Sequence, residues 1–481
     1  MNTQPVPPVR EFEPMKGRVT LAVLLTIGFY GLALGIVAGL LSIAWLLWVN
    51  GHHVNRLTAF CLIGAGAILW SIIPRPERFR APGPALEAAS NPRLFKELKD
   101  VASKVGEPMP HEVYLVPDVN AGVRERGGFM GVHGRRVMLL GLPLLQVLTV
   151  SEMRAVLAHE FGHYHGGDTR LAPWIYKTRE AIIRTVRQLS GSSSLLHLPF
   201  VWYGQMFLRV TQAISRRQEF AADALAARTV GAHPLGSGLR TIFGAALAYD
   251  GYWRDEVVPV LSAGFLPPLA DGFAQFLREP RVADAVNRAT EEEMTTPRTD
   301  PYDSHPSLPD RMKALEGLPP GPEPANDPPA LSLLENAAGA EPPLAASLLK
   351  AGAPALRPVS WPDVGIEVQV PYWAARVRRE AQLLAGQTVA DIPRLMPPSN
   401  LADAARRSRC VTIAAALAVA LVGTGWTLES LPGAAPVLHR GADSLEPFSV
   451  VQDLLDGKLT DQAWQGRAAA LGIANLRLSV T

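Results

Sequence analysis

The segment 157–163, Leu-Ala-His-Glu-Phe-Gly-His, has residue types and spacing suited to metal chemistry. It matches the pattern HExxH, in which two histidines bind zinc and the glutamate between them acts as a base. On an α-helix, residues four positions apart lie on one face, so His159 and His163 can direct two imidazole nitrogens at one ion. Glu160 lies beside them, where its carboxylate can accept a proton from a zinc-bound water. The spacing therefore predicts a zinc site with its own general base.

A catalytic zinc site needs three protein ligands and one open position for water. One pattern takes the third ligand from a histidine six residues after the second, but Thr169 stands there and excludes that class. Another uses a glutamate on a later helix, and the segment 215–223, Ser-Arg-Arg-Gln-Glu-Phe-Ala-Ala-Asp, supplies Glu219. Alone, Glu219 and Asp223 at helical spacing would usually lie on a solvated face. Downstream of HExxH, we expect Glu219 to be the third ligand and Asp223 to steady a ligand imidazole.

The residues around these motifs read as helices that can pack closely. Residues 149–152, Thr-Val-Ser-Glu, form a capping-box pattern, and Met153, Val156 and Leu157 give an apolar stripe. In the second motif, the small side chains of residues 221–222, Ala-Ala, allow a close approach of two helices. The sequence therefore predicts two packed helices that share one metal ion.

Three ordered motifs together resemble the HtpX-like family of membrane zinc metallopeptidases, which includes the CAAX prenyl endopeptidases and the mitochondrial Oma-type proteases. They are Ala-His-Glu-Phe-Gly-His at 158–163, Arg-Gln-Glu-Phe-Ala-Ala-Asp at 217–223 and Ser-His-Pro-Ser-Leu-Pro-Asp-Arg at 304–311. The resemblance implies gluzincin-type chemistry with one catalytic Zn²⁺, and it places His305 and Arg311 near the active site. We expect His305 to stabilise the oxyanion of the tetrahedral intermediate and Arg311 to orient or assist it.

Composition limits the other classes of function. A chain of 481 residues can hold two or three domains, and a net charge of +2 gives no reason to expect nucleic acid as a partner. The two cysteines, Cys61 and Cys410, lie in or beside apolar segments. A disulfide framework and a cysteine-ligated metal are therefore not expected.

Three apolar segments predict an integral membrane protein. Residues 19–49 contain no charged residue and exceed the ~20 residues that span a bilayer. Residues 57–73 form a second, shorter apolar run, and together the two predict a transmembrane helical hairpin over 19–74. Residues 411–428, directly after three arginines, predict a third transmembrane helix.

Basic residues predict the orientation. Three precede the first apolar run, three follow the second, and the connection between the runs has only Arg56. By the positive-inside rule, the hairpin ends and the catalytic segment lie on the cytoplasmic side of the inner membrane, in a multi-pass chain. The third helix would place the tail 429–481 on the far side. The uncharged stretch 188–208 could be a span, an interfacial segment or part of a substrate groove, and these alternatives stay open.

The expected fold is mainly α with a small β-sheet: a zincin-like metallopeptidase domain carried on transmembrane helices. Strands are expected at 111–116 and 136–140, with a Gly-rich loop or hairpin at 120–134. Related zinc proteases pair their substrate with an edge strand just before the HExxH helix; here that would be Val137–Leu140, although a core strand is equally compatible. The domains are a cytoplasmic tail (1–18), the membrane hairpin (19–74), the peptidase domain (81–318), a Pro-rich linker (319–330), a helical extension (331–405), the third membrane helix (411–428) and a C-terminal tail (429–481).

The expected activity is hydrolysis of peptide bonds by a zinc-activated water, in the quality control of membrane proteins. Its partners would be a peptide or membrane-protein substrate and the lipid bilayer, with homo-oligomerisation left open. One alternative is a CAAX-type prenyl-protein endopeptidase, although three spans are too few for a large intramembrane chamber. Another is a zinc-stabilised scaffold without activity, against which the retained Glu160 argues. A protease cleaving within the bilayer fits poorly, because charged Glu152 and Arg154 lie in the HExxH helix.

Overall fold

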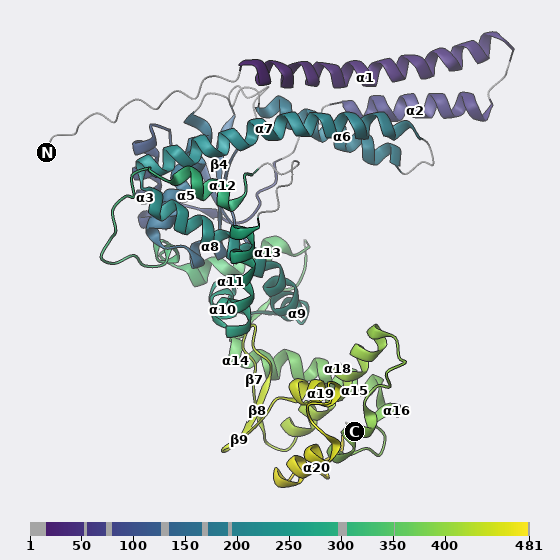
Figure 1. Cartoon of the computed structure of the whole chain (residues 1–481), viewed down its shortest axis with the longest axis vertical. Helices are drawn as coiled ribbons and strands as arrows, with labels where there is room; N and C mark the ends of the chain where they lie inside the picture. The colour runs from purple at the N-terminus through teal and green to yellow at the C-terminus, as the bar shows by residue number, and fades with distance from the viewer. Residues whose placement is uncertain are drawn as a thin grey trace. The chain divides into compact units, whose positions relative to one another are not determined.

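The chain forms two compact units in the computed structural model (Figure 1). The first comprises Met1–Val116, Asn120–Phe243 and Thr290–Glu335, and the second Pro117–Val119, Gly244–Ala289 and Asn336–Thr481. The described residues are 16–51, 55–73, 79–126, 134–165, 172–190, 195–296, 305–350 and 352–479. Most of the predicted N-terminal tail lies outside them. The predicted peptidase domain at 81–318 is thus interrupted, because 244–289 pack with the C-terminal part of the chain.

The first unit begins with an antiparallel pair of apolar helices, α1 (Lys16–Val49) and α2 (Arg56–Ile72) (Figure 1). The Asn55 side chain caps α2 by accepting a hydrogen bond from the Thr58 N–H at 2.9 Å. Along α1, a buried seam recurs every three or four residues, whereas large apolar side chains on its other faces are exposed. Of the described helices, α1 is long and apolar enough to cross a membrane, and α2 is a shorter apolar helix.

A second helical hairpin packs on the first. It consists of α6 (Ala172–Ser190), the short η2 (Leu195–His197) and α7 (Leu198–Thr229). Phe200, Tyr203 and Phe207 share a core with α1 and α2, and the Tyr203 hydroxyl donates to the Leu25 carbonyl at 2.7 Å. The stretch 188–208, which the sequence left open, therefore comprises the end of α6, η2 and the first part of α7, with 191–194 outside the described residues, and α6 and α7 pack on the apolar pair.

A four-stranded sheet with the order β1-β2-β4-β3 lies in the same unit. Its strands are β1 (Ala85–Leu86), β2 (Glu112–Val116), β3 (Ala121–Arg126) and β4 (Arg135–Gly141). The strand β4 pairs in parallel with β2 and antiparallel with β3. The suggestion that Val137–Leu140 is the edge strand is therefore wrong, because both sides of β4 are hydrogen-bonded. The end strand on that side is β3, from the segment expected to be a loop or hairpin.

The HExxH motif lies on α5 (Val150–His165), which packs against α3 (Pro92–Val105) and follows α4 (Leu142–Val147). The predicted capping box is present: the Thr149 N–H donates to Glu152 Oε2 at 2.9 Å, and the Glu152 N–H to Thr149 Oγ1 at 3.3 Å. The Val150 N–H donates to the Pro328 carbonyl at 2.9 Å. The Pro-rich segment 319–330 is therefore packed on the first unit rather than free. The helix α12 (Leu308–Leu315) completes the surroundings of the site.

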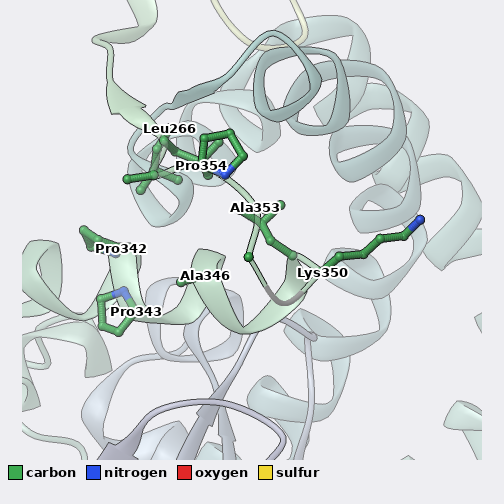
Figure 2. A pocket seen from close by; sticks show the side chains of 11 residues that line it. Leu266, Pro342, Pro343, Ala346, Lys350, Ala353 and Pro354 are labelled. Carbon is green, nitrogen blue, oxygen red and sulfur yellow. The ribbon is translucent and has the colours of Figure 1, made fainter.

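The second unit is mostly helical. A parallel pair, β5 (Phe265–Leu266) and β6 (Arg357–Pro358), joins its two sequence segments, and β7 (Thr427–Glu429), β8 (Val437–Arg440) and β9 (Asp443–Leu445) form an antiparallel meander. Beside β5 lies a groove of about 580 Å³ with largely apolar walls, including Pro342, Pro343 and Pro354 (Figure 2). Lys350 is the charged residue lining it, so this groove offers no set of groups for catalysis.

The remaining helices are α8 (Ala232–Gly251), η3 (Tyr252–Val257), α9 (Val258–Ser262), α10 (Leu269–Arg278), α11 (Pro280–Thr295), η4 (Ala330–Leu333), α13 (Ala337–Leu348), α14 (Trp361–Val364), η5 (Gly365–Gln369), α15 (Val370–Arg379), α16 (Ala381–Leu384), η6 (Val389–Asp391), α17 (Ile392–Leu395), α18 (Asp403–Val422), α19 (Pro447–Leu455) and α20 (Asp461–Ala470).

The predicted third transmembrane helix at 411–428 is wrong. The helix α18 ends at Val422 and is followed by the strand β7. Its residues Ile413–Ala418 are at most 1% exposed and share a core with Trp373, Leu438 and Trp464. This part of the helix is apolar on all sides because protein surrounds it, which is the other environment that selects such a sequence. The expectation that 429–481 lies across the membrane therefore loses its basis.

Topology reporters should detect this difference. Because α18 is a core helix, we expect fusions of a side-specific reporter at Gly317 and after Thr481 to give the same signal. A fusion at Asn50, in the α1–α2 connection, should give the opposite one. Different signals at Gly317 and Thr481 would contradict the burial of α18 in a protein core.

Candidate metal centre

The two helices that carry the metal motifs cross at small residues. At Gly162 on α5, an added Cβ would lie 3.1 Å from the Ala222 Cα and 3.2 Å from its Cβ on α7. Such contacts are tighter than ordinary van der Waals packing, so the crossing is as close as these residue types allow. The crossing brings HExxH on α5 beside Glu219, which α7 carries one turn before Ala222.

Two imidazole nitrogens and the two carboxylate oxygens of Glu219 lie at the spacing that zinc requires. His159 Nε2 is 3.1 Å from His163 Nε2 and 3.5 Å from Glu219 Oε2, and His163 Nε2 is 3.6 Å from Glu219 Oε1. Ligands about 2.0–2.1 Å from a tetrahedral zinc ion stand about 3.3 Å apart. Glu219 Oε2 is buried and accepts no hydrogen bond of good geometry from the described residues. These atoms therefore fit a zinc ion bound by two histidines and a glutamate.

Asp223 contacts the first histidine, His159, at Nδ1, the ring nitrogen that does not face the other ligand atoms, and Arg311 holds Asp223 in place. Asp223 Oδ1 lies 2.8 Å from His159 Nδ1, so it fixes the ring orientation that leaves Nε2 facing the other ligands. Arg311, on α12, donates two hydrogen bonds to the Asp223 carboxylate, at 2.6 and 2.8 Å. Asp223 is 1% exposed, and a buried carboxylate needs such a partner. Arg311 thus contacts Asp223 directly, whereas the sequence had suggested that it assists His305.

Glu160 lies against the end strand of the sheet. It forms a group with His159 and His163 whose potential ligand atoms lie within 4.8 Å of one another. The backbone N–H of Val123, on β3, lies near its carboxylate and acts to lower its pKa. Sequence reasoning missed Val123, because a backbone donor leaves no trace in residue type. The one available signal was the Gly-rich stretch at 120–134, which could form a hairpin and so bring a strand beside the site.

His305 approaches the site from the segment before α12. Its Nδ1 lies 3.1 Å from Glu219 Oε2, while 62% of its side chain is exposed. It can thus reach the ligand group and still face a bound molecule. The structure therefore brings together every residue that the sequence had selected: His159, Glu160, His163, Glu219, Asp223, His305 and Arg311.

Burial and neighbouring charges shift the pKa values of the titratable groups in the site in different directions. Burial alone would lower the pKa of His159, but the adjacent carboxylates of Asp223 and Glu219 raise it to about 9. Burial and the neighbouring His159 lower the pKa of His163 to about 4. Burial favours the protonated form of Glu219, but His159 and His305 outweigh it and hold that pKa well below its usual range. Burial raises the pKa of Glu160 to about 7, despite the opposing charge of His159, and a base near neutrality suits proton transfer.

Comparisons with known proteins relate this chain to a family of peptidases. Residues 88–318 match the family model of Peptidase family M48. The chain is 27% identical to Protease HtpX of Idiomarina loihiensis over 211 residues, or 39% of this chain and 71% of that protein. It is 32% identical to a Protease HtpX homolog of Acidiphilium cryptum over 161 residues (31% and 54%). The match to the homolog of Tropheryma whipplei is 28% over 154 residues (29% and 52%). The chain thus spans about half the length of the last two, and no solved structure matches it significantly.

The helix crossing predicts that Gly162 controls zinc affinity. In Gly162→Ala, the new methyl group must push α7 away by a few tenths of an ångström, which moves Glu219 relative to the histidines. We expect zinc to bind about tenfold more weakly or worse, as when a residue supporting the ligands is lost, measured by competition with a chromophoric chelator. Gly466→Ala, on α20 where the Cβ has open space, is the control. Equal affinity in all three proteins would show that the crossing tolerates the methyl group.

Zinc binding should depend on pH through His159. Because its pKa is raised to about 9 in the metal-free site, His159 is protonated at neutral pH, and zinc must displace that proton. His163 is already neutral, since its pKa is lowered to about 4. Apparent affinity should therefore rise about tenfold per pH unit from about pH 6 to 8 and level off above about 9. Calorimetry in buffers of different ionisation enthalpy would count the released proton; binding without proton release at pH 7 would contradict this assignment.

Proposed function

Residues 88–318 belong to peptidase family M48, and we propose that this peptidase is a zinc-dependent endopeptidase anchored in a membrane. The observation that carries the proposal is the group of nitrogen and oxygen atoms from His159, His163 and Glu219, which lie 3.1–3.6 Å apart beside Glu160. Two imidazoles and one carboxylate with an adjacent carboxylate base are the donor set of a hydrolytic zinc site.

The residues of the chain divide the reaction between them. A zinc ion at this site supplies Lewis-acid activation of the attacking water and of the scissile carbonyl. Glu160, with a pKa near neutrality, accepts the proton of the water and delivers it to the leaving amine. His305, whose side chain is largely exposed, is the candidate donor to the oxyanion. Asp223 and Arg311 hold His159 in the orientation that binding requires.

The end strand β3 is the proposed docking edge for the substrate. It lies beside α5, and the backbone of Val123 is close enough to Glu160 to affect the pKa of that carboxyl group. An extended peptide that pairs with β3 would run past the metal ligands, with main-chain hydrogen bonds giving affinity independent of sequence. This mode suits an enzyme that cleaves unfolded segments, and it supports a role in the quality control of membrane proteins.

The membrane anchor is α1 together with α2. Residues Thr20–Val49 of α1 are apolar and long enough to span a bilayer, and many of their large side chains are exposed, as expected for contact with lipid. The excess of basic residues outside the connection supports an orientation with the catalytic unit on the cytoplasmic side of the inner membrane. Substrate choice would then be limited to proteins that reach this side.

Glu160→Gln should abolish proteolysis and leave zinc bound. The amide keeps the shape of the carboxyl group but cannot accept a proton, and Glu160 is not a ligand in this assignment. Cleavage of an unfolded model substrate such as casein, together with metal analysis of the same sample, would measure both properties. Normal turnover, or loss of the metal, would remove Glu160 from the role of base. A wild-type protein that binds zinc but never cleaves would favour the scaffold alternative.

Substitutions of Glu219 and Asp223 should separate a ligand from a supporting residue. Glu219→Ala should lose zinc at ordinary chelator concentrations, because two histidines alone leave the site short of a ligand. Asp223→Ala should weaken zinc binding by about 10–100-fold. Asp453→Ala, far along the chain on α19, is the matched control. Full zinc occupancy in Glu219→Ala would place the third ligand elsewhere.

A further inference from the structure

Arginines gather in one part of the second unit. Residues 370–409 contain seven arginines and no lysine against three acidic residues, which gives a net charge of +4 in a chain whose total is +2. Such an uneven distribution of charge indicates a local partner of opposite charge rather than a general aid to solubility. The arginines are Arg376, Arg378, Arg379, Arg394, Arg406, Arg407 and Arg409.

The fold brings these arginines to one end of a helix pair. The helix α15 packs against α18 (Figure 1). On α15, the Arg376 guanidinium donates to Thr412 Oγ1 at 2.9 Å and to the Ser408 carbonyl at 2.8 Å, both on α18. The segment before α15 contains Gly365, where an added Cβ would lie 2.9 Å from Leu428 on β7, the strand that follows α18. The two helices therefore run antiparallel, and the last turn of α15 lies beside the first turns of α18.

The helix α17 adds a further arginine at the same end. Arg409 Nε donates to the Leu395 carbonyl at 2.8 Å, and this bond joins α17 to the first part of α18. Arg394 directly precedes Leu395 and is exposed, with Asp391 Oδ1 3.3 Å from its guanidinium. These contacts gather the arginines of α15, α17 and α18 at one end of the helix pair. We call the seven residues the arginine cluster.

Three members of the arginine cluster lack a partner in the protein. Arg378, Arg379 and Arg407 are exposed, and none of their side chains pairs with a described residue. Like charges repel, so an unpaired group of this kind opposes the compact state. An anionic partner would offset this repulsion when it binds.

Exposed apolar side chains accompany the arginine cluster. Tyr372 is 56% exposed and lies one helical turn before Arg376, and Val411 is 37% exposed and lies one turn after Arg407. Arginines beside an exposed tyrosine are typical of a surface at a membrane interface, where the ring enters the headgroup region and guanidinium groups contact phosphates. The chain also carries α1, which is long and apolar enough to cross a membrane. Lipid phosphate would then be the anion at the highest local concentration.

We propose that the arginine cluster docks on the surface of an anionic bilayer, with its exposed guanidinium groups against lipid phosphates. This inference rests on the proposed anchoring by α1 and α2, which would keep the enzyme beside lipid. Each basic residue near an anionic leaflet strengthens association by about fivefold, so three together favour the docked state by about a hundredfold. The second unit thereby gains its own attachment to the membrane, and this attachment depends on the charge of the lipid.

A fluorescent label beside the arginine cluster tests the docking. Full-length protein with Cys61→Ala and Cys410→Ala carries the label at Ser399→Cys, an exposed position between α17 and α18. It is reconstituted in phosphatidylcholine vesicles with and without phosphatidylglycerol, and both contain a lipid with a nitroxide on its headgroup. The nitroxide should quench the label in the phosphatidylglycerol vesicles, and about 1 M salt should remove the quenching. A label at Ala442→Cys, in the turn between β8 and β9, should not be quenched.

A triple variant tests which residues hold the bilayer. Arg378→Gln, Arg379→Gln and Arg407→Gln together should weaken the docked state by about a hundredfold and abolish quenching at position 399. A matched control with the same loss of charge should keep the quenching. It replaces three other exposed arginines of the second unit with glutamine: Arg278, Arg281 and Arg288. Because the arginines of the cluster repel one another, the triple variant should unfold at no lower a temperature than the wild type.

The outcomes separate docking from anchoring. If the enzyme stays with both kinds of vesicle but the label at 399 is equally bright in both, the inference is wrong while the anchor stands. Equal quenching in the triple variant and its control would also overturn the inference. If the enzyme leaves neutral vesicles and stays on anionic ones only while the three arginines are present, the anchor fails while the docking stands. Binding of polyglutamate or of a DNA duplex, without quenching in phosphatidylglycerol vesicles, would assign the cluster to a protein or nucleic-acid partner instead.

Discussion

The close crossing of α5 and α7 is the contact on which the metal centre depends. Two of the proposed ligands lie on α5 and the third on α7, so the separation between them depends on how closely the two helices approach. Gly162 against Ala222 makes that distance nearly as short as side chains permit. Protein interiors are densely packed and transmit small displacements. The rest of both helices therefore has to hold this contact rigidly. Buried residues of α5, and the apolar core that α7 shares with α1, α2 and α6, hold the two helices in position.

A second constraint is the burial of charge around that crossing. Glu219 and Asp223 are both buried carboxylates, and each would be costly to bury without a partner. Asp223 has Arg311 and His159 as partners. Glu219 has a buried oxygen without a good hydrogen bond, so a cation is the partner that its position favours. Asp223 thus has its partners within the protein, whereas Glu219 has an oxygen that can bind a metal ion.

The position of β3 shows how a sheet can orient the base. Because β4 is enclosed by β2 and β3, it supplies a rigid middle strand, and the strand next to α5 is β3. The backbone of Val123 lies near the Glu160 carboxylate and acts to lower its pKa. The end strand, the proposed base and the three proposed ligands therefore lie close together, as binding of an extended peptide would require.

The sequence alone determined the composition of the site. Ligand spacing within one helix is fixed by the helical repeat, so His159 and His163 could be assigned from their order, and the capping box of α5 from four residues. The resemblance to a family supplied His305 and Arg311. Only the tertiary structure decided what depends on contacts between distant segments: the end position of β3, the donor Val123 and the bond from Arg311 to Asp223. It also decided the meaning of apolar runs. Residues 19–49 and 411–428 look alike as sequences, because lipid and protein interiors select the same side chains, but α18 is enclosed by protein whereas α1 exposes large apolar side chains.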